Sequence, residues 1–142
     1  MVWKGKPLTE ALIGVVIPAY NYARTLGRAV ESVLAQLDEA DAQLLVIDDG
    51  STDETPQVLE ALLAKHPGRF QVLRKPNGGL ASVRNRGIEE SAGQYLMFLD
   101  ADDEMAPGAL ALVAQHIATH PDSRLIIGGH WSVFEDGKRR LH

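Results

Sequence analysis

The chain has 142 residues, a formal net charge of −5 and 45% hydrophobic residues, and it contains no cysteine. Its length predicts one domain or part of one, and the lack of cysteine excludes disulfides and thiolate metal sites. The acidic balance argues against nucleic acid as a partner, and the absence of any apolar run of about 18 residues predicts no membrane-spanning helix.

The first half of the chain alternates between predicted strands and helices. Apolar runs at 13–19, 44–48 and 70–74 predict buried strands, and the helical spacing of apolar residues in 24–37 predicts a helix after the first of them. Ser51 and Glu54 have the spacing of a capping box at the start of the next helix. Residues 1–10 are expected to form an N-terminal tail, without the long apolar stretch of a signal peptide.

The second half continues this alternation. We expect a helix at 80–91, a strand at 94–99, a helix from Pro107 to His120 and a fifth strand at 125–129. Residues 131–135 and 138–141 flank Asp136-Gly137, a pair favoured in two-residue hairpin turns. The pattern predicts an α/β fold, in which helices cover both faces of a mostly parallel sheet.

Four of the predicted strands end in polar or glycine-rich segments. These segments are Pro18-Ala19-Tyr20-Asn21, Asp48-Asp49-Gly50-Ser51, Pro76-Asn77-Gly78-Gly79 and Asp100-Ala101-Asp102-Asp103. Ligands of open α/β sheets bind outside the carboxyl ends of the strands, so we expect all four segments to line one edge.

The carboxylates of Asp100, Asp102 and Asp103 are the strongest chemical signal in the chain. Unpaired carboxylates repel one another and resist burial, and a divalent cation with hard oxygen ligands relieves that repulsion. Asp100 and Asp102 should point to the same side of an extended segment, because side chains alternate there. Taken alone, an Asp-x-Asp fits a solvated acidic turn as well as a metal site.

In order, spacing and residue type, the four segments resemble the motif series of the family 2 glycosyltransferases, over roughly residues 11–129. The resemblance implies a Rossmann-like GT-A fold over residues 11–142. It also implies a domain that binds a nucleotide-diphosphate sugar through Mn²⁺ or Mg²⁺ and transfers the sugar with inversion. The implied donor is linked to UDP or dTDP, and the acceptor is a glycan, a lipid-linked group or another hydroxyl that the sequence does not identify.

The resemblance also implies roles for individual residues. Asp102 and Asp100 would hold the metal, and Asp48 would accept a hydrogen bond from the base, which favours uracil or thymine over cytosine. Asp49 is expected to organise its loop as well, and Arg84 either contacts phosphate or base or pairs with Glu89 or Glu90. The full set expected around the nucleotide is Pro18, Ala19, Tyr20, Asn21, Asp48, Asp49, Asn77, Gly78, Gly79, Arg84, Asp100 and Ala101.

No catalytic base can be assigned from the sequence. Inverting members of the family carry a carboxylate well downstream of the Asp-x-Asp, and the acidic residues available here, Glu104, Asp122, Glu135 and Asp136, do not match it in position. We therefore expect a catalytic domain that is incomplete at its C-terminus. Its expected place is the cytoplasm or the inner face of the membrane, in cell-surface polysaccharide or glycan synthesis.

Three other functions compete with this interpretation. A nucleotide-sugar-binding fragment without transferase activity and a nucleotidyltransferase both stay open. A haloacid-dehalogenase-like phosphatase is disfavoured, because its two aspartates stand two positions apart, whereas Asp48 and Asp49 are adjacent and point to opposite sides of a strand.

Overall fold

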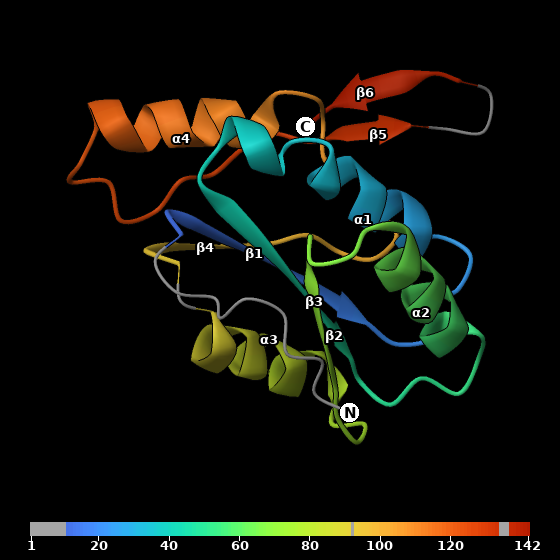
Figure 1. Cartoon of the computed structure of the whole chain (residues 1–142). Coiled ribbons are helices and arrows are strands. Elements are labelled where there is room, and N and C mark those ends of the chain that lie inside the picture. Colours follow the sequence, from blue (N-terminus) through green and yellow to red (C-terminus); the bar gives the residue numbers. More distant parts are fainter. Residues whose placement is uncertain (1–10, 92, 134–136) are drawn as a thin grey trace.

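The computed structural model describes residues 11–91, 93–133 and 137–142. Four parallel strands form one sheet in the order β3-β2-β1-β4 (Figure 1). A two-stranded antiparallel hairpin follows, and together these elements confirm the predicted α/β fold. The strands are β1 (Ile13–Ala19), β2 (Ala42–Asp48), β3 (Gln71–Arg74), β4 (Tyr95–Phe98), β5 (Trp131–Val133) and β6 (Arg139–Leu141), and the helices are α1 (Leu26–Leu34), α2 (Thr55–Lys65), α3 (Gly79–Glu90) and α4 (Ala109–Thr119).

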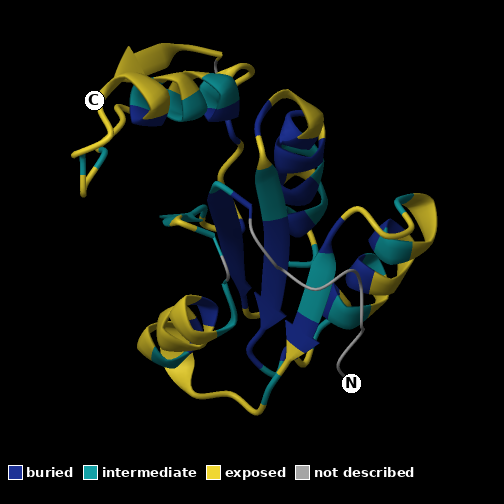
Figure 2. Cartoon of the chain, turned by 60° about the vertical axis from the view of Figure 1, so that its left-hand side comes forward, coloured by how far each residue is buried: buried dark blue, intermediate teal, exposed yellow. Residues whose placement is uncertain are grey.

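The four-stranded sheet separates two layers of helices. Ile13, Val15 and Ile17 of β1 belong to the core formed with α1, α2 and α4, whereas Val16 packs with Val83 of α3 on the other face. All seven residues of β1 are buried, as expected for an apolar parallel strand that is covered on both sides. In Figure 2 the buried residues accordingly lie in the central strands and on the inner sides of the helices.

Several helix boundaries differ from the expectation, and the helix predicted from Pro107 to His120 spans Ala109–Thr119. The helix predicted at 24–37 ends at Leu34, and a 3-10 helix at Leu37–Glu39 continues the chain. The predicted capping box is wrong, because α2 begins only at Thr55 and its first N–H donates to Asp53 Oδ1 at 2.9 Å. The hydroxyl of Ser51 instead accepts a hydrogen bond from a neighbouring loop.

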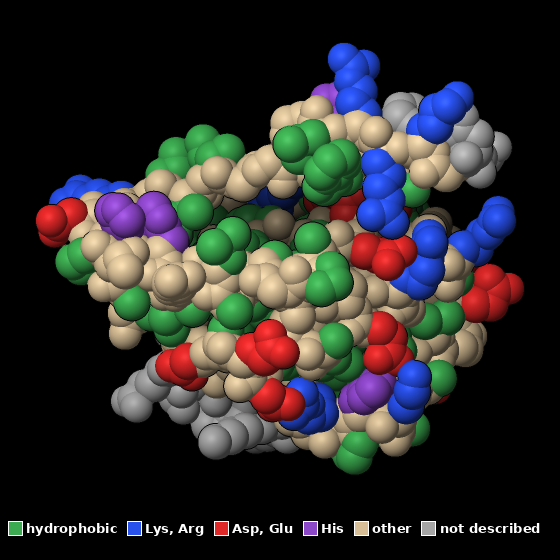
Figure 3. Space-filling view, turned by 90° about the horizontal axis from the view of Figure 1, so that it is seen from above, with side chains coloured by type: hydrophobic (Ala, Val, Ile, Leu, Met, Phe, Trp, Pro, Cys, Tyr) green, Lys and Arg blue, Asp and Glu red, His purple; other side chains and the backbone are tan. Residues whose placement is uncertain are grey.

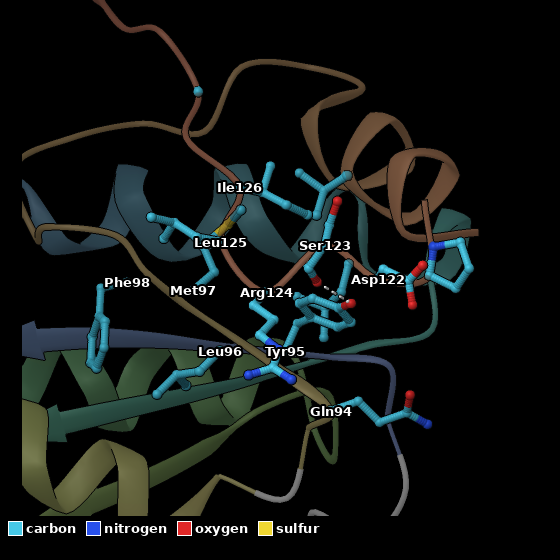
Figure 4. Close-up of a pocket in the computed structure, with 14 residues that line it drawn as sticks. Gln94, Tyr95, Leu96, Met97, Phe98, Asp122, Ser123, Arg124, Leu125 and Ile126 are labelled. Carbon is cyan, nitrogen blue, oxygen red and sulfur yellow. Dashed lines mark hydrogen bonds between the residues drawn. The ribbon is translucent and has the colours of Figure 1, made fainter. Parts of the chain in front are cut away.

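The predicted strand at 125–129 is wrong. Residues 124–130 form neither strand nor helix, because they make no ladder of hydrogen bonds with β4, an edge strand of the sheet, and a cavity of about 1040 Å³ lies between part of this segment and β4 (Figure 4). Leu125 and Ile127 are exposed, and Tyr95 Oη donates to the Ser123 carbonyl at 2.7 Å beside the cavity. None of the residues predicted to bind nucleotide or metal lines this cavity.

The strands of the predicted hairpin are confirmed. β5 and β6 pair antiparallel, with Trp131 opposite Leu141, and both of these side chains are exposed. Figure 3 shows basic side chains projecting from this end of the molecule. Asp136 of the predicted turn and the predicted tail at 1–10 lie outside the described residues. Among the residues that are described, no helix is both long and apolar enough to cross a membrane.

Candidate nucleotide and metal site

The carboxyl ends of the parallel strands bring the four predicted segments to one edge of the sheet. Ala19 at the end of β1 lies beside Asp48 at the end of β2, and Asp48 lies beside Arg74 at the end of β3. On the other side of β1, the Leu99 N–H donates to the Val16 carbonyl at 3.0 Å, so β4 delivers the acidic segment to the same edge. The shared edge that the alternation predicted is therefore present.

Asn21 joins the loop after β1 to the loop after β2. Its side-chain Oδ1 accepts hydrogen bonds from the N–H groups of Thr52 (2.8 Å) and Asp53 (3.2 Å), and its own N–H donates to Ser51 Oγ at 2.9 Å. Asn21 has a φ of 61°, a left-handed conformation that asparagine tolerates better than most residues. Its side chain therefore orients protein backbone, while the neighbouring Tyr20 is 44% exposed.

The same two loops are joined by two more hydrogen bonds. The N–H of Tyr22 donates to Thr55 Oγ1 at 2.9 Å, and the N–H of Ala23 donates to Asp53 Oδ2 at 3.2 Å. Burial acts to raise the pKa of Asp53, but the hydrogen bonds from Thr55 and from backbone N–H groups outweigh it and hold that pKa below its ordinary value. The carboxylate of Asp53 therefore accepts hydrogen bonds both from the start of α2 and from the loop after β1.

Asp48 is buried and only partly hydrogen-bonded. Its Oδ1 accepts the N–H of Ser51 at 2.9 Å, and Arg74 Nε lies 3.2 Å from its Oδ2. That N–H is not aligned for a hydrogen bond, so Oδ2 is a buried oxygen without a hydrogen-bond partner. Arg74 is also held by the Ser51 carbonyl, to which Nη2 donates at 3.0 Å. Asp48 thus has one carboxylate oxygen that accepts no hydrogen bond, at the carboxyl end of β2.

Asp49 faces the opposite side of β2 and holds the glycine-rich segment. Its carboxylate accepts the N–H groups of Gly78 (3.0 Å) and Gly79 (2.8 Å) and pairs with Lys75 Nζ. Burial acts to raise the pKa of Asp49, but these three donors together lower it. Because Gly78 is the N-cap of α3 and has no capping side chain, Asp49 caps that helix from another strand.

The glycine-rich segment itself lies at the surface. Asn77, Gly78 and Gly79 are exposed, and Gly79 has a φ of 81°, which only glycine adopts readily. Lys75, which is 19% exposed in its side chain, was missed by the sequence analysis. The signal for it was the Arg74-Lys75 pair at the end of a strand and directly ahead of a predicted ligand loop.

The acidic segment is a turn and not an extended strand end, which corrects the expectation for Asp100 and Asp102. The Asp103 N–H donates to the Asp100 carbonyl at 3.0 Å, and the side chain of Ala101 is buried in the core, so the chain must bend between the carboxylates. Burial and the negative charges of Asp102 and Asp100 raise the pKa of Asp103. The turn therefore concentrates negative charge, and Asp100 and Asp102 are exposed.

Arg84 lies beside this turn. Its Nη2 is 3.5 Å from Asp100 Oδ1, and its guanidinium carbon is 5.8 Å from the ring centroid of Phe98. Glu89 and Glu90 are paired with another arginine of α3, so the surface pairing considered for Arg84 is not formed. Arg84 therefore places a cation at the edge where a diphosphate would meet the acidic turn.

The donor set at this turn fits a divalent cation only in part. Exposed carboxylate oxygens are the ligands that Mg²⁺ and Mn²⁺ prefer, and their mutual repulsion favours a cation. Within the described ranges, however, no three His, Cys, Asp or Glu side chains are grouped to hold a metal ion. Asp100 and Asp102 would supply part of a coordination shell, and a ligand such as a diphosphate would have to supply more.

Comparison with known proteins places this geometry in context. A family model described as Glycosyl transferase family 2 matches residues 14–142. Chondroitin synthase from Pasteurella multocida is 34% identical in an alignment that covers 89% of this chain and 14% of that protein. Glycosyltransferase GlyG from Streptococcus pneumoniae is 31% identical, over 87% of this chain and 40% of that protein. The chain thus spans less than half the length of these relatives.

Two solved structures have a similar fold. TarS from S. aureus, in complex with UDP-GlcNAc, superposes with a TM-score of 0.67 at 27% identity, covering 77% of this chain and 32% of that one. The mannosyltransferase PcManGT from Pyrobaculum calidifontis, in complex with GDP-Man and Mn²⁺, gives a TM-score of 0.69 at 23% identity, covering 81% of this chain and 34% of that one. At that identity, the second likeness bears on the fold alone.

Proposed function

Because the chain belongs to glycosyl transferase family 2 and has the GT-A fold, we propose that it binds the nucleotide-diphosphate sugar donor of an inverting transfer to a hydroxyl acceptor. The observation that supports this most is the meeting of three features at one sheet edge. These are the acidic turn at 100–103, the cation of Arg84 beside it, and the loop carrying the exposed Tyr20.

In this proposal, Asp102 and Asp100 hold Mn²⁺ or Mg²⁺. When bound, the cation neutralises the diphosphate and so stabilises it as a leaving group. Arg84 would pair with a phosphate oxygen, for which its planar donor geometry is suited, once Asp100 turns toward the metal. TarS, a structural neighbour, is solved in complexes with UDP and with UDP-GlcNAc, which supports a nucleotide-sugar site in this fold.

In this proposal the base lies at the carboxyl ends of β1 and β2, beside Pro18, Ala19, Tyr20 and the adjacent carboxylates of Asp48 and Asp49. Asp48 Oδ2 is buried, lies 3.2 Å from Arg74 Nε and accepts no hydrogen bond, so the imide N–H of uracil or thymine could donate to it once the groups that cover it move aside. Cytosine has no such donor, so UDP or dTDP is the proposed nucleotide. Asn77, Gly78 and Gly79 would lie against the ligand through exposed backbone, whereas Asn21 acts by holding the loop after β2.

Calorimetric titration of the chain with UDP, dTDP, CDP, GDP and ADP, each with and without Mn²⁺, tests both parts of the proposal. We expect UDP and dTDP to bind more tightly than the others and only in the presence of Mn²⁺. Equal binding of all five, or binding that ignores Mn²⁺, would contradict it. Separate Asp48→Asn and Asp49→Asn variants then tell which carboxylate reads the base.

Asp102→Ala is the matched test of the metal assignment. Its side chain is exposed, so we expect the fold to persist, with unchanged thermal unfolding, while the Mn²⁺ effect on UDP binding disappears. Asp122→Ala, which removes another exposed aspartate outside this edge, should leave the Mn²⁺ effect intact. A variant at Asp102 that still responds fully to Mn²⁺ would rule out this residue as a ligand.

Transfer by this chain alone is a separate question. Glu104, the acidic residue nearest the turn in sequence, is paired with Arg28 at 3.3 Å, and no general base is assigned. We propose slow donor hydrolysis with little transfer, since loss of a general base costs roughly 10²–10⁴-fold. A radiolabelled UDP-sugar assay would separate hydrolysis from transfer, and donor binding with neither activity would favour a binding fragment.

Placement of the protein in the cytoplasm or at the inner face of the membrane stays a prediction.

A further inference from the structure

A row of polar side chains on α1 contacts the chain that leaves the acidic turn. Arg28, Ser32 and Gln36 are spaced by four residues, so they lie along one side of α1 and its continuation. Ser32 Oγ accepts the N–H of Met105 at 2.9 Å, and Gln36 Oε1 accepts the N–H of Leu110 at 3.3 Å. We call Arg28, Ser32 and Gln36 the α1 row.

The members of the α1 row differ in how firmly they are held. Gln36 is 5% exposed, and its Nε2 donates to the Ser32 carbonyl at 2.9 Å, so both ends of the amide are hydrogen-bonded. The Ser32 hydroxyl donates to the Ala29 carbonyl at 2.7 Å, which directs its acceptor lone pairs outward. Arg28 and its partner Glu104 are both more than half exposed, and surface ion pairs of this kind contribute little. Ser32 and Gln36 are therefore the members of the α1 row that can hold the backbone at Met105 and Leu110 in place.

Ser32 contacts Met105, two residues after the turn, and Gln36 contacts Leu110 in the first turn of α4. Ala101 is buried within it, Met105 is buried just after it, and Leu110 is fully buried at the start of α4. The N-cap of α4 is Gly108, which has no side chain to cap the helix, and Gln36, just after α1, supplies a cap to the N–H of Leu110. The acidic turn is thus anchored on one side by Ala101 and on the other by the two α1 side chains.

We propose that Ser32 and Gln36 are positioning residues, which hold the turn at 100–103 in the geometry that binds a divalent cation with a nucleoside diphosphate. This inference rests on the proposed function of Asp100 and Asp102. The like charges of the carboxylates in this short turn repel one another. If the backbone after the turn is already fixed, less conformational entropy is lost when the carboxylates bind one cation. Neither residue touches the ligand, and both act through the backbone at Met105 and Leu110.

Three variants of the full chain test the inference, with Mn²⁺ and UDP as probes. Ser32→Ala removes the acceptor for Met105, Ser32→Thr retains a hydroxyl, and Gln36→Leu removes both amide contacts at similar volume. Glu31→Ala is the matched control, since Glu31 is the neighbouring residue on α1 and bonds Lys65 and His66 of the α2 region instead. The measurements are the Mn²⁺ dependence of UDP binding and hydrogen exchange at the Asp103 and Met105 amides.

We expect Ser32→Ala and Gln36→Leu to weaken Mn²⁺-dependent UDP binding about fivefold, the equilibrium effect of one ordinary hydrogen bond, and to speed exchange at both amides. Ser32→Thr should restore most of the affinity, and Glu31→Ala should lose stability without losing the Mn²⁺ effect. Unchanged Mn²⁺ affinity in both test variants would overturn the inference while the proposed function stands. If the unsubstituted chain shows no Mn²⁺ effect, the proposed function fails and the inference fails with it.

Discussion

Replacing Asp49 with alanine tests whether one buried carboxylate holds the start of α3 against the carboxyl end of β2. The carboxylate is 2% exposed and accepts two backbone N–H groups at the start of α3, together with the Lys75 ammonium. A hydrogen bond to an ionised acceptor contributes about 1.5–3 kcal/mol. Gly78 and Gly79 are exposed and can be hydrated once the carboxylate is gone, so the lower end of that range applies to each.

The expected cost of Asp49→Ala is therefore about 3 kcal/mol in the free energy of unfolding, or roughly 10 °C in Tm for a chain of this size. Lys75 adds little to this cost, because its ammonium also donates to the Pro76 carbonyl at 2.9 Å and can reach water. Urea unfolding at pH 7, followed by circular dichroism, measures the difference. Asp38→Ala is the control, since Asp38 is an exposed aspartate paired with Arg69 and its loss should change little.

The pH dependence of the Asp49→Ala effect identifies its cause. The pKa of Asp49 is lowered in the folded chain, so its ionised form stabilises the fold fully above the ordinary aspartate range. That contribution is lost as pH falls through the lowered pKa. The difference between the unsubstituted chain and the variant should stay constant from pH 7 to about pH 5 and narrow below about pH 4. A cost below about 1 kcal/mol at pH 7, or one that does not narrow in acid, would refute the capping role.

Three more substitutions probe the site and its support. Gly79→Val should lower the free energy of unfolding by about 2 kcal/mol, because a valine is strained at the positive φ of Gly79, and it should weaken UDP binding. The control Gly27→Ala, whose new Cβ would meet open space, should reduce neither stability nor UDP binding. Urea unfolding measures the stability and calorimetry measures the binding. Gly87→Leu should cost about 2–3 kcal/mol in urea unfolding, because a Cβ there would meet Val16 Cγ1 at 2.9 Å, and an unchanged midpoint would show that α3 can shift. Arg84→Leu should weaken binding of UDP more than that of uridine in calorimetry, and equal losses would exclude a phosphate contact.

The strands of the sheet could be predicted from sequence because the longest of them are continuous apolar runs. Residues 13–19 and 44–48 are continuous apolar runs, and a parallel strand that is covered on both faces needs no other information. The run at 125–129 is also mostly apolar but does not form a strand, because it does not pair with β4, and a cavity lies between part of it and that strand. A strand depends on a hydrogen-bonding neighbour, and no local pattern records whether that neighbour is present.

The site could be predicted as a set of segments but not as a set of contacts. Parallel strands carry their carboxyl ends to one edge, so the meeting of residues 18–21, 48–51, 76–79 and 100–103 follows from topology alone. The turn at 100–103 did not follow, because it depends on the burial of Ala101, which the neighbouring aspartates obscure in sequence. The division of labour between Asp48 and Asp49 depends on which face of β2 each one occupies.

The starts of α3 and α4 share one property that local capping rules do not contain. α3 and α4 both begin after a glycine N-cap, and each takes its cap from a side chain far away in sequence, Asp49 for α3 and Gln36 for α4. A local serine or aspartate cap would stabilise the helix alone. A remote cap also fixes the position of the helix start relative to the strand or helix that supplies it. Remote caps tie the loops before α3 and α4 to the rest of the domain. If the proposed function holds, this coupling lets Asp49, Ser32 and Gln36 affect UDP binding through the positions of those loops.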